Sequence, residues 1–162
     1  MHITSLAAIN ATTLMAGTTA GLFLTTNSGT SWKSVNGDLH HLDITAITKV
    51  GTRIFIAARE GGIYASDNNG TSWIDFNDSN TKEVNGTIAL IYNSITDRLM
   101  VLNSAGFFVT DAASTVIVGT FSAALSDLPS ATTIYSISNS TNQWYLATDK
   151  GMFISATSAI NW

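Results

Sequence analysis

The sequence predicts an all-β protein in which one small sheet is repeated along the chain. The eight residues 25–32 return at 66–73, and both copies fit the pattern Ser/Thr-x-Asn-x-Gly-x-Ser-Trp. A glycine followed by a short apolar run precedes each copy, and that glycine recurs at positions 21, 62, 106 and 151. Self-similarity at a period of about 40–45 residues is typical of propellers, in which each repeat forms one blade. We therefore predict a β-propeller with four short four-stranded antiparallel blades per chain.

The recurring glycine divides the chain into four units, at approximately 1–40, 41–84, 85–129 and 130–162. The last two units carry a weaker frame, with Ser114 in place of the turn glycine and Trp162 in the place of Trp32 and Trp73. The four units account for the whole sequence, so we expect a single propeller domain.

The second unit shows its strands most clearly. Apolar or alternating runs bounded by Gly, Asn, Ser and Asp predict strands A to D at 44–50, 53–58, 62–66 and 73–76. A Gly-Thr pair separates the first two strands, and the Asn-containing box separates the last two. No segment has the periodicity of a helix.

Composition limits the possible functions. Only 11% of the residues are charged, against roughly 25% in ordinary domains. The net charge of −4 argues against a nucleic-acid partner, because phosphate binding needs clustered Lys and Arg. The absence of cysteine excludes disulfides and thiolate metal sites. No apolar run approaches the ~18–20 residues of a membrane span, so a soluble protein without membrane insertion is expected.

The apolar N-terminus is interpreted as the first strand and not as a signal peptide. It lacks Lys and Arg, and polar residues interrupt it. Ile3 lies as far before Gly21 as Ile44 lies before Gly62. The compartment is left open by these observations.

The two boxes resemble the Asp-box, or bacterial neuraminidase repeat, of sialidase-like, sortilin-like and photosystem-assembly-factor-like propellers. The resemblance extends over all four units and is strong in two. It implies that the box closes the hairpin between strands C and D, and it favours an extracytoplasmic location. It also implies three structural roles: a capping amide, a left-handed glycine and a tryptophan packed between blades. The residues in these roles are Asn27, Gly29, Trp32, Asn68, Gly70 and Trp73.

Two local clusters could be interpreted as metal sites. Asp67, Asn68 and Asn69 gather oxygen atoms, but they carry too little charge for calcium. His40, His41 and Asp43, with His2 at the place equivalent to Asp43, could supply part of a transition-metal site. Adjacent histidines in an extended segment point to opposite sides, so a solvated loop is the favoured interpretation. We expect neither a metal nor a cofactor.

Catalysis is not expected. In sialidases the family pattern is an arginine cluster, a Tyr–Glu nucleophile pair and an acidic general acid on six blades. This chain has only Arg53, Arg59 and Arg98, and Arg53-Ile54 is followed by Phe55 where the family has proline. Arg53 and Arg98 occupy equivalent places in successive units, which indicates repeat positions and not a converging centre.

A ligand-binding face is predicted where the B–C and D–A connections meet. In propellers these two loop sets share one face, and charged residues on it suggest a polar binding surface. The predicted ligand-binding residues are His40, His41, Asp43, Arg59, Glu60, Lys82, Glu83, Asp149 and Lys150.

The sequence therefore predicts a non-catalytic binding or scaffold module whose ligand is a glycan or a protein. A sialidase-like glycoside hydrolase and a self-assembling fragment or engineered unit are the alternatives. Because nothing follows Trp162, we expect the fourth blade to lack most of its outer strand. An open half-ring would expose apolar blade faces, which predicts a two-fold homodimer that closes an eight-bladed ring, against a four-bladed monomer or an isolated fragment.

Overall fold

The computed structural model describes residues 1–76, 86–87, 89–94, 97–103, 106–111, 128–140 and 143–156. Every regular element in these ranges is a β-strand, and the strands form four antiparallel sheets. Each sheet follows chain order, so each is one blade of the predicted propeller.

The first two blades have four strands each. Blade 1 contains β1 (Ile3–Ala8), β2 (Leu14–Thr18), β3 (Gly21–Thr25) and β4 (Lys33–Ser34). Blade 2 contains β5 (Ile44–Val50), β6 (Arg53–Ala58), β7 (Gly62–Ser66) and β8 (Ile74–Asp75). Strands A to C of the second unit are confirmed at the predicted bounds, whereas strand D is shorter than predicted.

The described parts of the last two blades have three strands each. Blade 3 contains β9 (Ala89–Asn93), β10 (Arg98–Asn103) and β11 (Gly106–Asp111). Blade 4 contains β12 (Ile134–Asn139), β13 (Gln143–Thr148) and β14 (Gly151–Ala156). The expectation of a missing outer strand in the fourth blade falls on residues outside the described ranges.

The repeat is visible in the strand pairing. In each blade the frame glycine pairs with the last residue of strand B, which gives Thr18↔Gly21, Ala58↔Gly62, Asn103↔Gly106 and Thr148↔Gly151. Strand A carries a register shift at Ile3/Ser5, Ile44/Ala46 and Ile134/Ser136 in blades 1, 2 and 4. These pairings define which residues are equivalent between blades.

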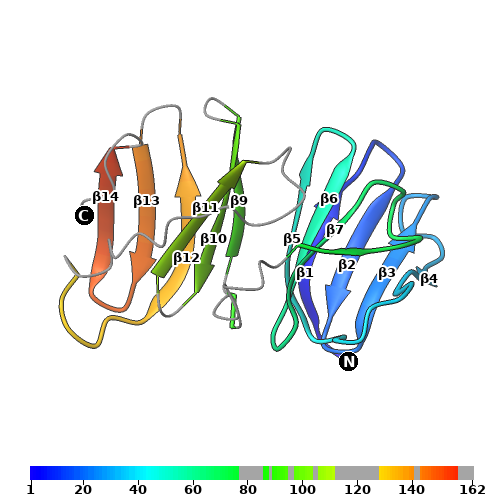
Figure 1. Ribbon diagram of the computed structural model, residues 1–162, viewed down its shortest axis with the longest axis horizontal. Helices are drawn as coiled ribbons and strands as arrows, with labels where there is room; N and C mark the ends of the chain where they lie inside the picture. The colour runs from blue at the N-terminus through cyan, green and yellow to red at the C-terminus, as the bar shows by residue number, and fades with distance from the viewer. Residues whose placement is uncertain are drawn as a thin grey trace.

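In Figure 1 blade 4 lies at the left end of the molecule and blade 3 beside it, and the strands of blades 1 and 2 overlap at the right end. β1 contacts β5, β5 contacts β9, and β9 contacts β12, so the first strands of successive blades lie beside one another. We call the side of a blade that turns to the next blade its forward face, and the opposite side its back face.

The core lies between the blades. Because side chains alternate along a strand, Ile54 and Ile56 of blade 2 point back to blade 1, whereas Phe55 and Ala57 point forward to blade 3. The blade 1–2 layer also contains Met15, Leu22, Leu24 and Trp73, the blade 2–3 layer Ile63, Ala65, Leu99 and Val101, and the blade 3–4 layer Met100, Leu102, Trp144 and Leu146.

Candidate binding face

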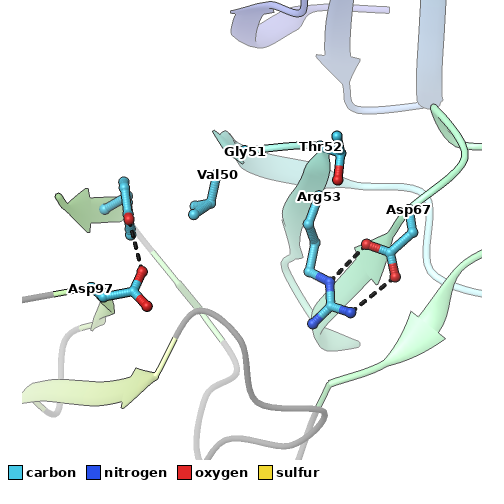
Figure 2. A pocket seen from close by; sticks show the side chains of 7 residues that line it. Val50, Gly51, Thr52, Arg53, Asp67 and Asp97 are labelled. Carbon is cyan, nitrogen blue, oxygen red and sulfur yellow. Dashed lines mark hydrogen bonds and ion pairs between the residues drawn. The ribbon is translucent and has the colours of Figure 1, made fainter.

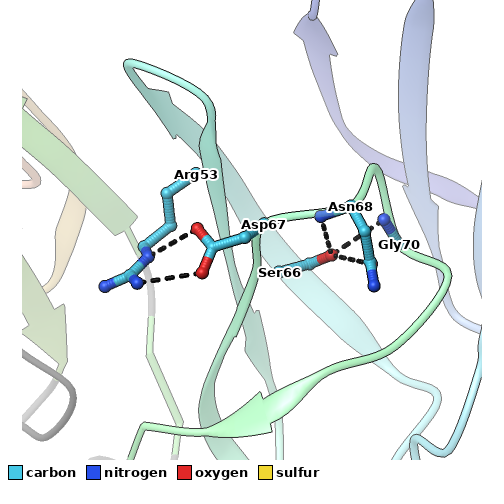
Figure 3. A network of polar contacts seen from close by, with 5 residues as sticks. All are labelled: Arg53, Ser66, Asp67, Asn68 and Gly70. Atoms are coloured by element: carbon cyan, nitrogen blue, oxygen red, sulfur yellow. Dashed lines mark hydrogen bonds and ion pairs between the residues drawn. The ribbon is translucent and has the colours of Figure 1, made fainter.

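The two boxes form the same hydrogen-bonded turn. In blade 2 the Asn68 side-chain oxygen accepts from the Ser72 N–H (2.9 Å) and from the Ser66 hydroxyl (2.9 Å). The Ser66 hydroxyl in turn accepts from the Gly70 N–H (2.9 Å), as Figure 3 shows. Blade 1 repeats these bonds with Asn27, Ser31, Thr25 and Gly29. The predicted amide cap is confirmed in both boxes.

The turn glycines have the predicted conformation, with φ of 89° at Gly29 and 83° at Gly70. The preceding residues are also left-handed, with φ of 56° at Ser28 and 54° at Asn69. Two consecutive positions of this turn therefore need positive φ.

The two box tryptophans differ in their surroundings. Trp73 is 6% exposed, and its indole N–H donates to the Val35 carbonyl of blade 1 (3.3 Å). Trp32 is 41% exposed, so the prediction that it is mostly buried was wrong. Trp73 packs on blade 1, whereas no described blade lies against Trp32. The third and fourth units have Ile117 and Trp162 at the place of these tryptophans, and both residues lie outside the described ranges.

Two loops of blade 2 meet in the hollow that we call the loop hollow, of about 270 Å³. Its lining is His40, His41, Leu42, Asp43, Arg59 and Glu60. The first four residues come from the D–A crossing and the last two from the B–C connection. The sequence predicted that these two kinds of loop meet on one face. All five predicted site residues that precede position 61 thus lie around one hollow.

Backbone and side-chain contacts hold the two loops together. The Arg59 guanidinium pairs with Asp43 (Nε–Oδ2 2.6 Å), and the Arg59 N–H donates to the Asp43 carbonyl (2.8 Å). A β-carbon at Gly61 would lie 2.6 Å from Cδ2 of His41, so this close approach of the loops requires glycine.

The remaining predicted residues lie elsewhere. Asp149 and Lys150 are in the B–C turn of blade 4, where Lys150 Nζ lies 3.1 Å from Asp149 Oδ2. A hydrogen bond from the Thr133 N–H and the neighbouring Lys150 lower the pKa of Asp149. Lys82 and Glu83 lie outside the described residues.

The equivalence of His2 and Asp43 holds in the backbone. The Thr19 N–H donates to the His2 carbonyl (3.1 Å) as the Arg59 N–H does to Asp43. His2 therefore belongs to blade 1 and His40 and His41 to the crossing that follows. In the part of the chain that the structure describes, no three His, Cys, Asp or Glu side chains gather closely enough to hold a metal ion.

Sequence reasoning missed a second hollow, of about 450 Å³, at the opposite edge of the blades (Figure 2). There Arg53 pairs with Asp67 through two bonds (Nε–Oδ1 2.8 Å, Nη2–Oδ2 2.9 Å), and the Tyr92 hydroxyl donates to Asp97 (2.8 Å). The bond from Arg53 lowers the pKa of the Asp67 carboxyl. Val50, Gly51 and Thr52 complete the lining.

A sequence signal for this second hollow exists. The register places Arg98 opposite Asp111 in blade 3, at the positions equivalent to Arg53 and Asp67 in blade 2. An Arg–Asp pair at a repeated strand position thus marks this edge of the blades. The size of the hollow depends on how blades 2 and 3 sit together, which no local pattern encodes.

The three arginines do not form one cluster. Arg53 and Arg98 begin β6 and β10 at the edge of the A–B turns, whereas Arg59 follows β6 at the opposite edge. A carboxylate-gripping arginine cluster of the sialidase kind therefore has no counterpart in this arrangement.

No family model and no curated protein matches this chain, but solved structures do. The GH74 xyloglucanase from Xanthomonas campestris is 14% identical with a TM-score of 0.74, over 100% of this chain and 30% of that one. YCF48 bound to D1 peptide is 13% identical with a TM-score of 0.67, over 99% and 52%. The computationally designed Ika4 protein is 11% identical with a TM-score of 0.67, over 96% and 91%.

These similarities show the fold, which is a β-propeller architecture. The chain spans about half of the YCF48 chain and a smaller part of the xyloglucanase. In the described ranges no helix has the length and apolar character needed to cross a bilayer.

Proposed function

We propose that the chain is a non-catalytic binding module built from Asp-box blades, and that it binds an extended segment of another protein at the loop hollow. The observation that carries this proposal is the convergence of the D–A crossing and the B–C connection on one hollow lined by His40, His41, Leu42, Asp43, Arg59 and Glu60.

The lining suits a polypeptide ligand. It offers carboxylates, a guanidinium and two imidazoles, which can pair with charged side chains and with backbone N–H and C=O groups. Leu42 is exposed among them and adds an apolar contact. The lining contains no Trp, Tyr or Phe, so the flat ring against which a sugar would pack is absent from these six residues. A protein segment is therefore favoured over a glycan.

The non-catalytic part of the proposal rests on the arrangement of charge. Arg59 is already paired with Asp43 in the loop hollow, and Arg53 is paired with Asp67 at the opposite edge. A glycoside hydrolase needs two carboxyl groups placed across one scissile bond. In the loop hollow one of the two carboxylates, Asp43, is tied to the guanidinium.

A displayed library of random peptides tests the ligand class. Selected peptides are expected to bind the wild-type chain and to lose at least tenfold in affinity when Arg59→Ala removes the guanidinium. Arg53→Ala is the matched control, because it removes an arginine of the same kind from the opposite edge. Equal losses in both variants would place the ligand elsewhere.

A glycan array and a fluorogenic sialoside address the two alternatives. Glycan binding that depends on Arg59 would replace the protein ligand by a sugar at the same hollow. Turnover of the sialoside above the level of a buffer blank would overturn the proposal that the module is non-catalytic.

A further inference from the structure

Each interior layer of the stack joins the forward face of one blade to the back face of the next. Between blades 1 and 2, the forward residues Met15, Leu22 and Leu24 contact the back-face residues of blade 2, Trp73 among them. On the forward face of blade 2, Ile63 is 0% exposed because blade 3 covers it. Burial of such side chains is the main stabilising contribution of each layer.

In the described chain two faces have no blade against them: the forward face of blade 4 and the back face of blade 1. On blade 4, Met152 and Ile154 occupy the positions of Ile63 and Ala65 but are 67% and 46% exposed. On blade 1, Leu6 is 58% exposed and Trp32 41%. Seven of the nine exposed large apolar side chains in the described ranges belong to blades 1 and 4 and their ends, namely Met1, Ile3, Leu6, Trp32, Tyr135, Met152 and Ile154.

We infer that these two faces bind each other between two copies of this chain, so that blade 4 of each copy packs on blade 1 of the other in one closed ring. The repeat fixes the register of this contact. Trp73 shares the blade 1–2 core cluster with Leu22 and Leu24, whose equivalents in blade 4 are Met152 and Ile154. Trp32 of the second copy therefore packs on Met152 and Ile154.

The blade 1–2 junction also predicts which residues meet at the first strands of the two end blades. The Thr4 hydroxyl donates to the Ile44 carbonyl at the blade 1–2 junction. The equivalent of Thr4 in blade 4 is Tyr135, and the equivalent of Ile44 in blade 1 is Ile3, both of which are exposed. Tyr135 of one copy thus lies beside Ile3 of the other.

Two features of the molecule favour a second copy as the occupant. The first is complementarity. Every interior layer joins a forward face to a back face through the same repeat positions, so the forward face of blade 4 and the back face of blade 1 are matching surfaces. The arc of this chain also matches about half of the YCF48 chain, so two copies supply the length of one such chain. Contacts of this head-to-tail kind close into rings when the rotation allows.

The ring does not depend on the ligand proposed above, but it determines how the binding sites for that ligand are arranged. Copies related by rotation about the ring axis turn their B–C and D–A loops to the same side. Two loop hollows then share one face, which raises the avidity for a ligand that carries two binding segments.

The solution mass tests the inference directly. Light scattering is expected to give twice the chain mass of 17.2 kDa for the wild type. Leu6→Glu and Met152→Glu each place a charge in the contact, and each is expected to shift the mass to a single chain. Ile74→Glu is the matched control, since Ile74 is 51% exposed on β8, outside the two end faces, and should keep the two-chain mass.

Mixing separates this head-to-tail contact from a contact between like faces. A mixed pair of the Leu6→Glu and Met152→Glu chains retains one unaltered junction, so the mixture is expected to regain two-chain particles that neither variant forms alone. Dissociation by only one of the two variants would indicate pairing of like faces and would overturn the inference. A single-chain mass for the wild type at every concentration would do the same.

Cross-linking gives a readout that survives if a variant folds poorly. The chain has no cysteine, so Ile3→Cys and Tyr135→Cys introduce single thiols. A short bis-maleimide is expected to join the two variants when they are mixed and to leave each variant alone unjoined. Equal cross-linking of Ile3→Cys with itself would contradict the proposed register.

Discussion

The boxes of blades 1 and 2 are the same turn in two surroundings. Their sequences agree in the pattern Ser/Thr-x-Asn-x-Gly-x-Ser-Trp, and the bonds of the capping amide and of the Ser/Thr hydroxyl are the same in both. The tryptophans differ most, with Trp73 at 6% and Trp32 at 41% exposure. The turn is therefore set by local sequence, whereas the burial of its tryptophan is set by whether a preceding blade lies against it.

Truncation of the two tryptophans should separate local from neighbour effects most strongly. Trp73→Ala removes a buried ring and an indole hydrogen bond, so we expect a loss of about 3–5 kcal/mol in the free energy of unfolding. Trp32→Ala should cost about 1 kcal/mol or less when the chain is dilute, because much of its ring is already in water. Urea unfolding at low protein concentration measures both.

Protein concentration sharpens this comparison. If Trp32 lies in a contact between copies, its truncation should become more costly as concentration rises, whereas the cost of Trp73→Ala should change little. Equal losses for the two variants in dilute solution would mean that Trp32 is covered within one chain.

A β-branched residue at the turn glycine should give the next largest effect. Both glycines are left-handed, where a side chain costs roughly 1–2 kcal/mol. A β-carbon at Gly70 would also lie 3.2 Å from Cζ2 of Trp73 and 3.3 Å from Cε of Met15, whereas at Gly29 its nearest neighbour is 4.0 Å away. We expect Gly70→Val to cost about 2–4 kcal/mol and Gly29→Val about 1–2 kcal/mol in thermal or urea unfolding. Similar costs would mean that the crowding around Gly70 relaxes freely.

The fold was predictable because its signals are local. The tight turns at Gly51-Thr52 and at the boxes bound the strands, so β5, β6 and β7 were predicted to the residue. Strand D was overestimated, since β8 has only two residues, Ile74–Asp75. Its outer position gives it one neighbouring strand, and apolar character alone does not show where pairing ends.

The candidate site was only partly predictable. The loop hollow follows from topology, because the B–C and D–A connections of one blade must lie at the same edge. The second hollow, around Arg53 and Asp67, and the exposure of Trp32 depend on the packing of one blade against another. Patterns within one repeat carry no information about that packing.

The residue before the turn glycine offers a smaller and opposite test. Ser28 and Asn69 are both left-handed, but asparagine tolerates that region better than serine. Ser28→Asn should therefore stabilise the chain by about 0.5 kcal/mol, and Asn69→Ser should destabilise it by a similar amount. Matched changes of opposite sign in melting temperature would confirm that the two turns are interchangeable. A loss of stability for Ser28→Asn would show that the serine makes a contact the turn geometry does not explain.

The smallest expected difference between the two blades depends on pH. Blade 2 carries the Arg53–Asp67 pair, whereas blade 1 has Thr13 and Thr26 at the equivalent positions. Arg53 lowers the pKa of Asp67 below its ordinary value of 3.8, so the pair stabilises the fold above that value and the contribution is lost as pH falls through the lower folded pKa. Because the Asp67 side chain is half exposed, the effect should be only a few tenths of a kcal/mol.

Asp67→Asn should therefore lower the unfolding free energy slightly near neutral pH and converge with the wild type in acid. Thr26→Asn makes the same amide at the blade 1 position and should show a difference that does not change with pH. A pH-independent difference for Asp67→Asn would mean that the pair acts through its hydrogen-bond geometry and not through its charge.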